Sequence, residues 1–210
     1  MLKKLITSFV LVVFSILGIS TANAAVELKG DPKIALIYLS PAHDGGWTES
    51  IERGRLILEK KTGLKAAYTE DVSGTKTKTR QVVDLYVKRG YNIIIGTAWD
   101  YGEAFAEAAV AYPNVAFLNA AGETSGVNLE SFYARTYQGW YLAGMAAAGV
   151  TKTKKLGMVA GFPLAVVNWD INAFQRGAQA VDPDIQVVAS FVNTWFDPVK
   201  EGQAAKAMIE

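Results

Sequence analysis

Apolar runs and amphipathic segments alternate along the chain, and this alternation predicts its elements. The stretch Ile34–Leu39 is almost continuously apolar, which is typical of a strand covered on both faces of a parallel sheet. Turn residues fill Ser40–Gly46. Apolar residues at helical spacing then predict a helix that begins near Thr48 or Ser50 and ends at Gly63. A strand–turn–helix unit therefore opens the predicted fold.

The same pattern recurs toward the carboxyl terminus. Further strands are predicted at Lys65–Thr69, Asn92–Ile95, Val115–Leu118, Asn128–Phe132, Leu156–Ala160 and Gln186–Phe191. Further helices are predicted at Lys78–Arg89, Tyr101–Ala111, Arg135–Val150, through Ala173–Ala180 after the loop Gly161–Trp169, and from Pro198 onward. Strands that alternate with helices over short turns predict an α/β fold with parallel sheets.

A polar break at Thr151–Lys155 divides the pattern into two lobes of similar build. We expect residues 25–150 to form an amino-terminal α/β lobe and residues 151–210 to begin a second one. The second lobe has two strand–helix units, too few to bury a sheet on both faces. Because the helical pattern continues to Met208–Glu210, we expect the chain to be a fragment cut within the second lobe.

The amino terminus has the pattern of a secretory signal peptide. Lys3 and Lys4 precede the apolar run Leu5–Ile19, and Ala22–Ala24 offers small residues for cleavage. We expect residues 1–24 to be removed, with an uncleaved anchor as the alternative. The sequence contains no cysteine, which excludes disulfides, zinc–thiolate sites and an acylated lipoprotein anchor. The prediction is a periplasmic protein whose mature form is not membrane-anchored.

Composition excludes several classes of function. The net charge is +1, so nothing favours a nucleic-acid partner. We interpret the small basic cluster Lys76–Arg80 as a solvated helix start. His43 is the single histidine, so no histidine metal cluster and no Ser-His-Asp triad is expected. Carboxylates are plentiful, but their spacing places no catalytic pair. We therefore predict no enzyme, no cofactor and no metal.

Candidate binding residues follow two predicted strands. Asp44 and Trp47 come after the first strand, and Trp99 and Asp100 come after Asn92–Ile95. Ligands of open α/β sheets bind at the carboxyl ends of strands, which makes these four residues candidates. Each has an alternative reading. Asp44 would turn its own loop, Asp100 would cap the following helix, and either tryptophan would belong to the core.

Four sequence blocks carry a resemblance to a known family. They are FYARTYQGWYLAGMAAAG, TKTKKLGMVAGFPL, NAFQRGAQAVDPDIQV and NTWFDPVKEGQAA, in that order. The chain from about Lys33 to its last residue resembles the basic membrane protein (BMP) family of solute-binding proteins. Characterised members serve ABC importers and bind nucleosides or purine bases. The resemblance implies a type I periplasmic-binding-protein fold, in which two Rossmann-like lobes close on a ligand about a hinge.

The resemblance also implies site residues. In the family, an aromatic residue after the first strand stacks on the base and an aspartate precedes it; here these are Trp47 and Asp44. A second aromatic from the other lobe completes the sandwich, and Trp195 is the best match, with Phe162 and Trp169 as alternatives. We leave Asn168 as a helix cap and Asp197 as the cap of the last helix.

These expectations lead to one predicted function and two alternatives. The leading prediction is a periplasmic binding protein that captures a purine base or nucleoside and delivers it to an ABC importer permease. The alternatives are a receptor subunit that presents its ligand to a membrane sensor, and a nucleoside hydrolase. Whether ribose is required stays open.

Overall fold

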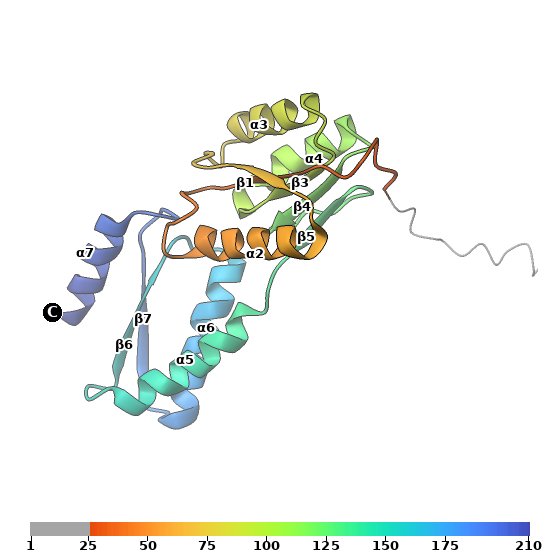
Figure 1. Cartoon of the computed structure of the whole chain (residues 1–210). Helices are drawn as coiled ribbons and strands as arrows, with labels where there is room; N and C mark the ends of the chain where they lie inside the picture. The colour runs from red at the N-terminus through yellow and green to blue at the C-terminus, as the bar shows by residue number, and fades with distance from the viewer. Residues whose placement is uncertain (1–25) are drawn as a thin grey trace, which may run out of the picture.

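The computed structural model describes residues 26–210 of the chain (Figure 1). The predicted signal peptide at residues 1–24 lies outside the described residues. Among the helices that are described, none is long and apolar enough to cross a membrane. The described part contains two parallel sheets with helices against them, which confirms the predicted α/β class.

The first sheet has five parallel strands in the order β2-β1-β3-β4-β5. In sequence order they are β1 (Ile34–Ile37), β2 (Ala66–Thr69), β3 (Ile93–Gly96), β4 (Ala116–Ala120) and β5 (Leu129–Phe132). The helices between them are α2 (Trp47–Thr62), α3 (Lys76–Lys88), the 3-10 turn η1 (Trp99–Tyr101) and α4 (Gly102–Ala111). Helices α2, α3 and α4 lie close to their predicted positions, because each has a clear apolar period and a glycine or proline near its end. The turn η1 was not predicted.

Helices cover both faces of this sheet (Figure 1). On one face, Val83 of α3 and Phe105 of α4 pack in one buried cluster with Ile94 of β3. On the other face, Leu58 of α2 packs against a second cluster that contains Leu36 of β1. The four residues of β1 are at most 4% exposed, so the apolar run that predicted a doubly covered strand is confirmed.

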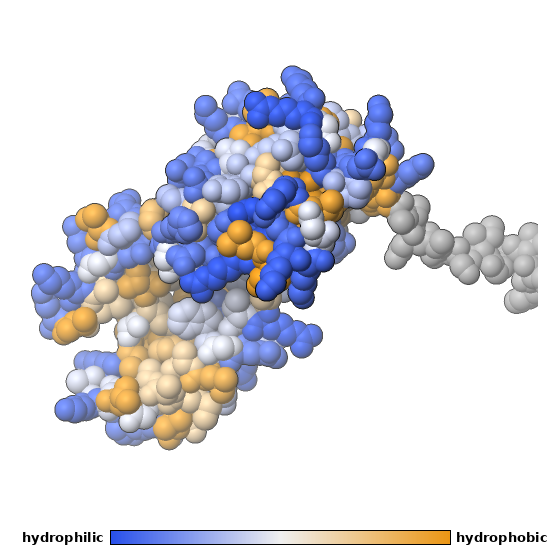
Figure 2. Space-filling model, in the orientation of Figure 1, coloured by the Kyte–Doolittle hydropathy of each residue, from blue (hydrophilic) through white to orange (hydrophobic). Residues whose placement is uncertain are grey.

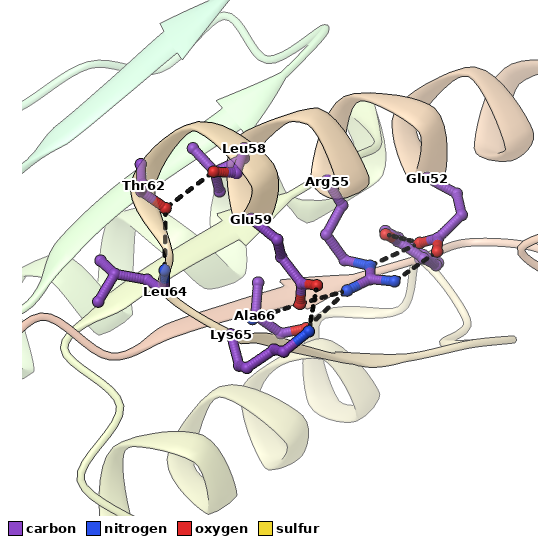
Figure 3. Close-up of polar contacts among 9 residues, drawn as sticks. Glu52, Arg55, Leu58, Glu59, Thr62, Leu64, Lys65 and Ala66 are labelled. Carbon is purple, nitrogen blue, oxygen red and sulfur yellow. Dashed lines mark hydrogen bonds and ion pairs between the residues drawn. The ribbon is translucent and has the colours of Figure 1, made fainter.

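Salt bridges tie α2 to the edge of the sheet. Figure 3 shows the Arg55 guanidinium between the carboxylates of Glu52 and Glu59, and Arg55 Nη1 also donates to the Ala66 carbonyl of β2 at 3.1 Å. The side chains of Arg55, Glu52 and Glu59 are 8% to 13% exposed to solvent. Pairs buried to this degree stay satisfied because each charge has several partners. They therefore fix the position of α2 and of the loop before it.

The second sheet has two parallel strands, β6 (Lys155–Ala160) and β7 (Gln186–Phe191). Three helices accompany it: α5 (Thr136–Val150), α6 (Ala165–Val181) and α7 (Pro198–Ile209). Helices α5 and α6 lie together on one side of the strand pair, and α7 lies on the other (Figure 1).

Two glycines let α5 and α6 approach each other closely. A Cβ atom on Gly144 would collide with the Phe174 carbonyl of α6, and one on Gly177 would collide with the Tyr141 carbonyl of α5. This contact explains the Gly- and Ala-rich composition of α5. It also groups α5 with the second sheet, so we propose that the two halves meet before Thr136 and not at residue 150. We call residues 26–135 the first half and residues 136–210 the second half.

One element begins earlier than predicted. Helix α6 starts at Ala165, and its cap position is Leu164, so Asn168 lies inside the helix and does not cap it. The segment 165–167 is Ala-Val-Val, which has no helix-start signal, but Val166 is only 7% exposed. Tertiary burial therefore decides the start of α6 against local propensity. The cap predicted for α7 is confirmed, because Asp197 accepts from the Lys200 amide at 3.0 Å.

Candidate functional site

A cavity of about 190 Å³ lies between the two halves. It sits beyond the carboxyl ends of β1, β3 and β4, and the first residues of α6 close it from the second half. Its walls are formed by Leu39, Ser40, Asp44, Trp47, Thr97, Ala98, Trp99, Ala121, Tyr133, Val166, Val167 and Trp195. Of the five residues predicted from the sequence, the cavity brings together Asp44, Trp47, Trp99 and Trp195. Asp100 is not on the wall.

Trp47 is the first residue of α2 and presents its ring to the cavity. The indole Nε1 donates to the Thr97 carbonyl at 2.7 Å, which fixes the side chain against the end of β3. The ring is 40% exposed, and it lies nearly parallel to the Tyr133 ring, with centroids 6.1 Å apart and planes at 25°. A side chain anchored at its nitrogen, partly exposed and lining the cavity is a suitable platform for a flat ligand.

Asp44 holds the loop and the start of α2. Its Oδ1 accepts from the amides of Gly46 and Glu49 at 2.8 and 3.1 Å, and its Oδ2 accepts from Ser40 Oγ and the Thr48 amide at 2.7 and 3.1 Å. Burial alone would raise the pKa of the Asp44 carboxyl, but these hydrogen bonds lower it below its ordinary value. The turn-forming alternative thus describes what Asp44 does here. A ligand contact would require it to give up one of these bonds.

Trp99 and Asp100 lie on η1, just past β3. Trp99 lines the cavity and is 37% exposed, which does not fit a core residue. Asp100 caps nothing: the cap position of α4 is Tyr101, without a side-chain hydrogen bond. The capping alternative is therefore wrong. Instead, Asp100 Oδ2 accepts from the indole Nε1 of Trp195 at 2.7 Å.

Trp195 reaches the cavity from the loop after β7. Of the three aromatic residues considered for the second wall, it is the one that lines the cavity. Phe162 packs behind it, with ring centroids 4.8 Å apart and planes at 58°. Trp169 lies elsewhere, in an open groove along α5 and α6 that also holds Tyr137 and Arg176. The structure thus favours Trp195 over both alternatives.

Sequence reasoning missed Tyr133. It directly follows β5, so the same rule that selected Trp47 and Trp99 would have found it. Burial raises the pKa of the Tyr133 hydroxyl, and the Asp170 carboxylate raises it further, although the hydrogen bond with Thr136 acts in the opposite direction. Thr136 has a single hydroxyl hydrogen, which it donates to Asp170 Oδ1 at 2.8 Å, so in its 3.3 Å contact with Thr136 Oγ1 the Tyr133 hydroxyl is the donor. Tyr133 therefore offers the cavity its ring and the remaining acceptor capacity of its hydroxyl oxygen.

Ala121 is a second wall residue that no sequence pattern indicated. It follows β4 with a left-handed φ of 61°, a conformation that costs energy for a residue with a Cβ. Its amide donates to the Phe132 carbonyl at 2.9 Å, which holds the strained turn between β4 and β5.

The cavity's chemistry suits binding. Its walls carry four aromatic rings, from Trp47, Trp99, Tyr133 and Trp195. Its polar side chains are mostly engaged with one another or with the backbone, as Asp44 and Thr97 show. Among residues 26–210, no group of three potential ligands could hold a metal ion. The arrangement offers stacking surfaces and few free polar groups.

A family profile described as "ABC transporter substrate-binding protein PnrA-like" matches residues 31–210. A purine-binding protein of Brucella abortus is 32% identical over 202 residues, which cover 95% of this chain and 57% of that protein. A Haloferax volcanii protein, provisionally named an ABC transporter glucose-binding protein, is also 32% identical, over 92% of this chain and 51% of its own length. The chain spans about half the length of the curated relatives it matches.

Solved structures give the same fold. A solute-binding protein of an ABC transporter system from Aeropyrum pernix superposes with a TM-score of 0.75 over 85% of this chain and 52% of that one, at 17% identity. At this identity the likeness concerns the fold alone. It confirms the predicted periplasmic-binding-protein-like architecture.

Proposed function

The chain belongs to the family of PnrA-like ABC transporter substrate-binding proteins, and from this premise we propose that it captures a purine base or nucleoside. The observation that carries the proposal is the cavity between the halves, with aromatic rings from both sides. Stacking on aromatic side chains contributes about 1–3 kcal/mol per base and tolerates either purine. The Brucella relative, which is named for purine binding, supports this choice.

In the proposed mechanism, the ligand stacks on Trp47 in the first half, and Trp195 closes over it from the second half. Contacts to both halves favour the closed arrangement, so binding drives closure about the segment that links them. Tyr133 lies in this segment and on the cavity wall. Its hydroxyl oxygen would orient the base by accepting from a ring N–H or an exocyclic amine.

A hexose is the second candidate, because the Haloferax relative carries a glucose-binding name. Sugars also stack on aromatic rings, but each hydroxyl needs a hydrogen-bond partner when it leaves water. The wall offers few: Asp44 already accepts four hydrogen bonds, and the Thr97 hydroxyl donates to the Ile37 carbonyl at 2.8 Å. This favours a flat heteroaromatic ligand over a hexose.

The hydrolase alternative has less support from the site. Glycosidic hydrolysis uses an acid and a base with accessible protons. On this wall the ionisable side chains are Asp44, whose lowered pKa and four donors keep it ionised and engaged, and Tyr133, whose pKa is raised. Neither has the properties of a general acid and base pair near neutral pH. Binding without chemistry is the better proposal.

We further propose that the protein is exported and hands its ligand to the permease of an ABC importer. The signal-peptide pattern at residues 1–24 and the family support this proposal. The alternative receptor role would use the same cavity with a different membrane partner. Stimulation of the importer's ATPase by the liganded protein would separate the two.

Isothermal titration of the purified protein with adenine, guanine, their nucleosides and glucose tests the proposed function. The expected result is saturable binding of at least one purine, no release of free base from a nucleoside, and weaker or no binding of glucose. Saturable glucose binding with no purine binding would replace the first candidate by the second.

A further inference from the structure

We propose that Asp100 is a positioning residue for the ligand cavity: it fixes the Trp195 ring across the two halves and does not touch the ligand. Only the ligand-binding test of this inference rests on the proposed function. It changes the role expected for Asp100, which the sequence suggested as a ligand contact.

The first observation is the hydrogen bond itself. Trp195 Nε1 donates to Asp100 Oδ2 at 2.7 Å, between residues 95 positions apart in the chain. Trp195 lines the cavity and Asp100 does not. The carboxylate therefore lies at the nitrogen edge of the tryptophan ring and off the cavity wall, where it acts on the ring's orientation. A hydrogen bond to an ionised acceptor is stronger than a neutral one.

The second observation is that both partners are held in place from behind. A Cβ atom on Gly74, in the loop before α3, would collide with the Asp100 Cβ and lie 2.9 Å from its Cγ. On the other side, a Cβ on Gly161 would lie 2.9 Å from Trp195 Cε3. Each glycine lets backbone pack directly against one partner. The pair is thus preorganised by its own half before the halves meet.

The third observation is how little else joins the halves by polar contacts. Residues 133–138, on either side of the boundary between the halves, form the linking segment. Apart from bonds inside this segment, the Asp100–Trp195 hydrogen bond is the only hydrogen bond or ion pair within residues 26–210 that joins the two halves. Breaking it should therefore release the Trp195 ring and loosen closure together. A role confined to folding of the first half would do neither.

The ligand-free test uses hydrogen exchange of the indole N–H groups. The chain has five tryptophans, and Trp47 provides an internal control, because its Nε1 donates to Thr97 within the first half. In Asp100→Ala we expect the Trp195 indole proton to exchange at least about ten-fold faster, with Trp47 unchanged. Asp100→Asn should restore slow exchange, because its amide oxygen still accepts. An unchanged Trp195 rate in Asp100→Ala would overturn the proposal.

The binding test is a double-variant cycle with adenine. Asp100→Ala should weaken binding about ten- to hundred-fold, as expected for a lost hydrogen bond to a charged group. Trp195→Phe keeps the ring and removes the donor, so the double variant should bind no more weakly than either single variant. If the two losses multiply, or if Asp100→Asn changes the ranking among purines, Asp100 contacts the ligand and the proposal is wrong.

A second variant covers the case in which Asp100→Ala does not fold. Gly74→Ala should push Asp100 aside and speed Trp195 exchange without changing either partner. Its matched control is Gly54→Ala, where a Cβ meets nothing within 4 Å. Equal exchange rates in the two glycine variants would also contradict the proposal. If no purine binds at all, the proposed function fails, while the exchange measurement still decides the role of Asp100.

Discussion

The two halves of the molecule use similar apolar sequences with different results. In the first half, five strands covered by helices on both faces bury large side chains completely, such as Tyr38, Phe105 and Phe117. In the second half, the apolar helix α5 buries only Gly144, and Figure 2 shows apolar surface gathered over it. Trp140 and Leu142 of α5 are 40% and 64% exposed.

The difference follows from the number of strands and not from hydrophobicity. A sheet of two strands gives each helix little surface to cover, so apolar side chains stay at the surface. Polar contacts show the same contrast. Helix α2 is tied to β2 by the buried Arg55 network (Figure 3), whereas α7 has the Asp197 cap and no buried residue. Apolar composition alone therefore does not report how much core a segment forms.

The largest expected effect is a loss of unfolding free energy when a buried phenylalanine of either half is replaced by alanine. Phe105→Ala, at a fully buried ring that packs against Tyr101 and Phe117, should cost about 3–5 kcal/mol of unfolding free energy. Phe174→Ala, in the second half at 8% exposure, should cost less, because its neighbours are themselves exposed. Urea denaturation measures both. Equal losses would break the contrast between the halves.

A glycine pair in α5 separates close packing from helix propensity. Gly144→Ala should destabilise the protein by about 1–3 kcal/mol, because its Cβ meets the Phe174 carbonyl. Gly139→Ala, in the same helix with nothing within 4 Å, should stabilise by up to about 1 kcal/mol. The measurement is the denaturation midpoint of each variant. A stabilising Gly144→Ala would mean that α5 and α6 separate easily.

The smallest expected effect concerns the pH dependence of stability, to which one aspartate of each half contributes with opposite sign. Hydrogen bonds lower the pKa of Asp44 against the effect of burial, so its contribution to stability is complete above the ordinary carboxyl pKa. That contribution is lost as the pH falls through the lowered folded value. Burial raises the pKa of Asp170, despite its hydrogen bond from Thr136, so its contribution is complete below the ordinary pKa and lost as pH rises through the folded value.

The check is the melting temperature of Asp44→Asn and Asp170→Asn between roughly pH 3 and pH 6. The melting temperature of the parent minus that of Asp44→Asn should increase as the pH rises. The melting temperature of the parent minus that of Asp170→Asn should decrease as the pH rises. Parallel curves for parent and variant would mean that neither carboxyl is perturbed as its environment indicates.

Much of this fold was predictable from the sequence, because its signals are local. The buried run in β1 and the cap Gly63 mark their elements without reference to the rest of the chain. The start of α6 was not predictable, since burial of Val166 between the halves decides it. The placement of α5 beside α6 likewise depends on the Gly144 and Gly177 contacts, which no single segment reveals.

The site divides in the same way. The rule that ligands lie beyond strand ends placed Trp47 and Trp99 on the cavity wall, and the family resemblance added Trp195. The roles of the two aspartates did not follow from position. A carboxylate at a strand end is equally suited to a turn, a cap or a ligand, and its partners decide. For Asp44 those partners are local amides, and for Asp100 the partner is a residue of the other half.

The most direct test of the central claim, that the cavity between the halves binds a purine, is adenine titration of three variants at two tryptophans. Trp47→Ala should weaken binding about ten- to hundred-fold, for a loss of roughly 1–3 kcal/mol of stacking, and Trp47→Phe should keep most of the affinity. Trp169→Ala is the matched control, because Trp169 is 51% exposed in the groove along α5 and α6. It should bind adenine as the parent does. Full affinity in Trp47→Ala together with a loss in Trp169→Ala would contradict the account and move the site to that groove.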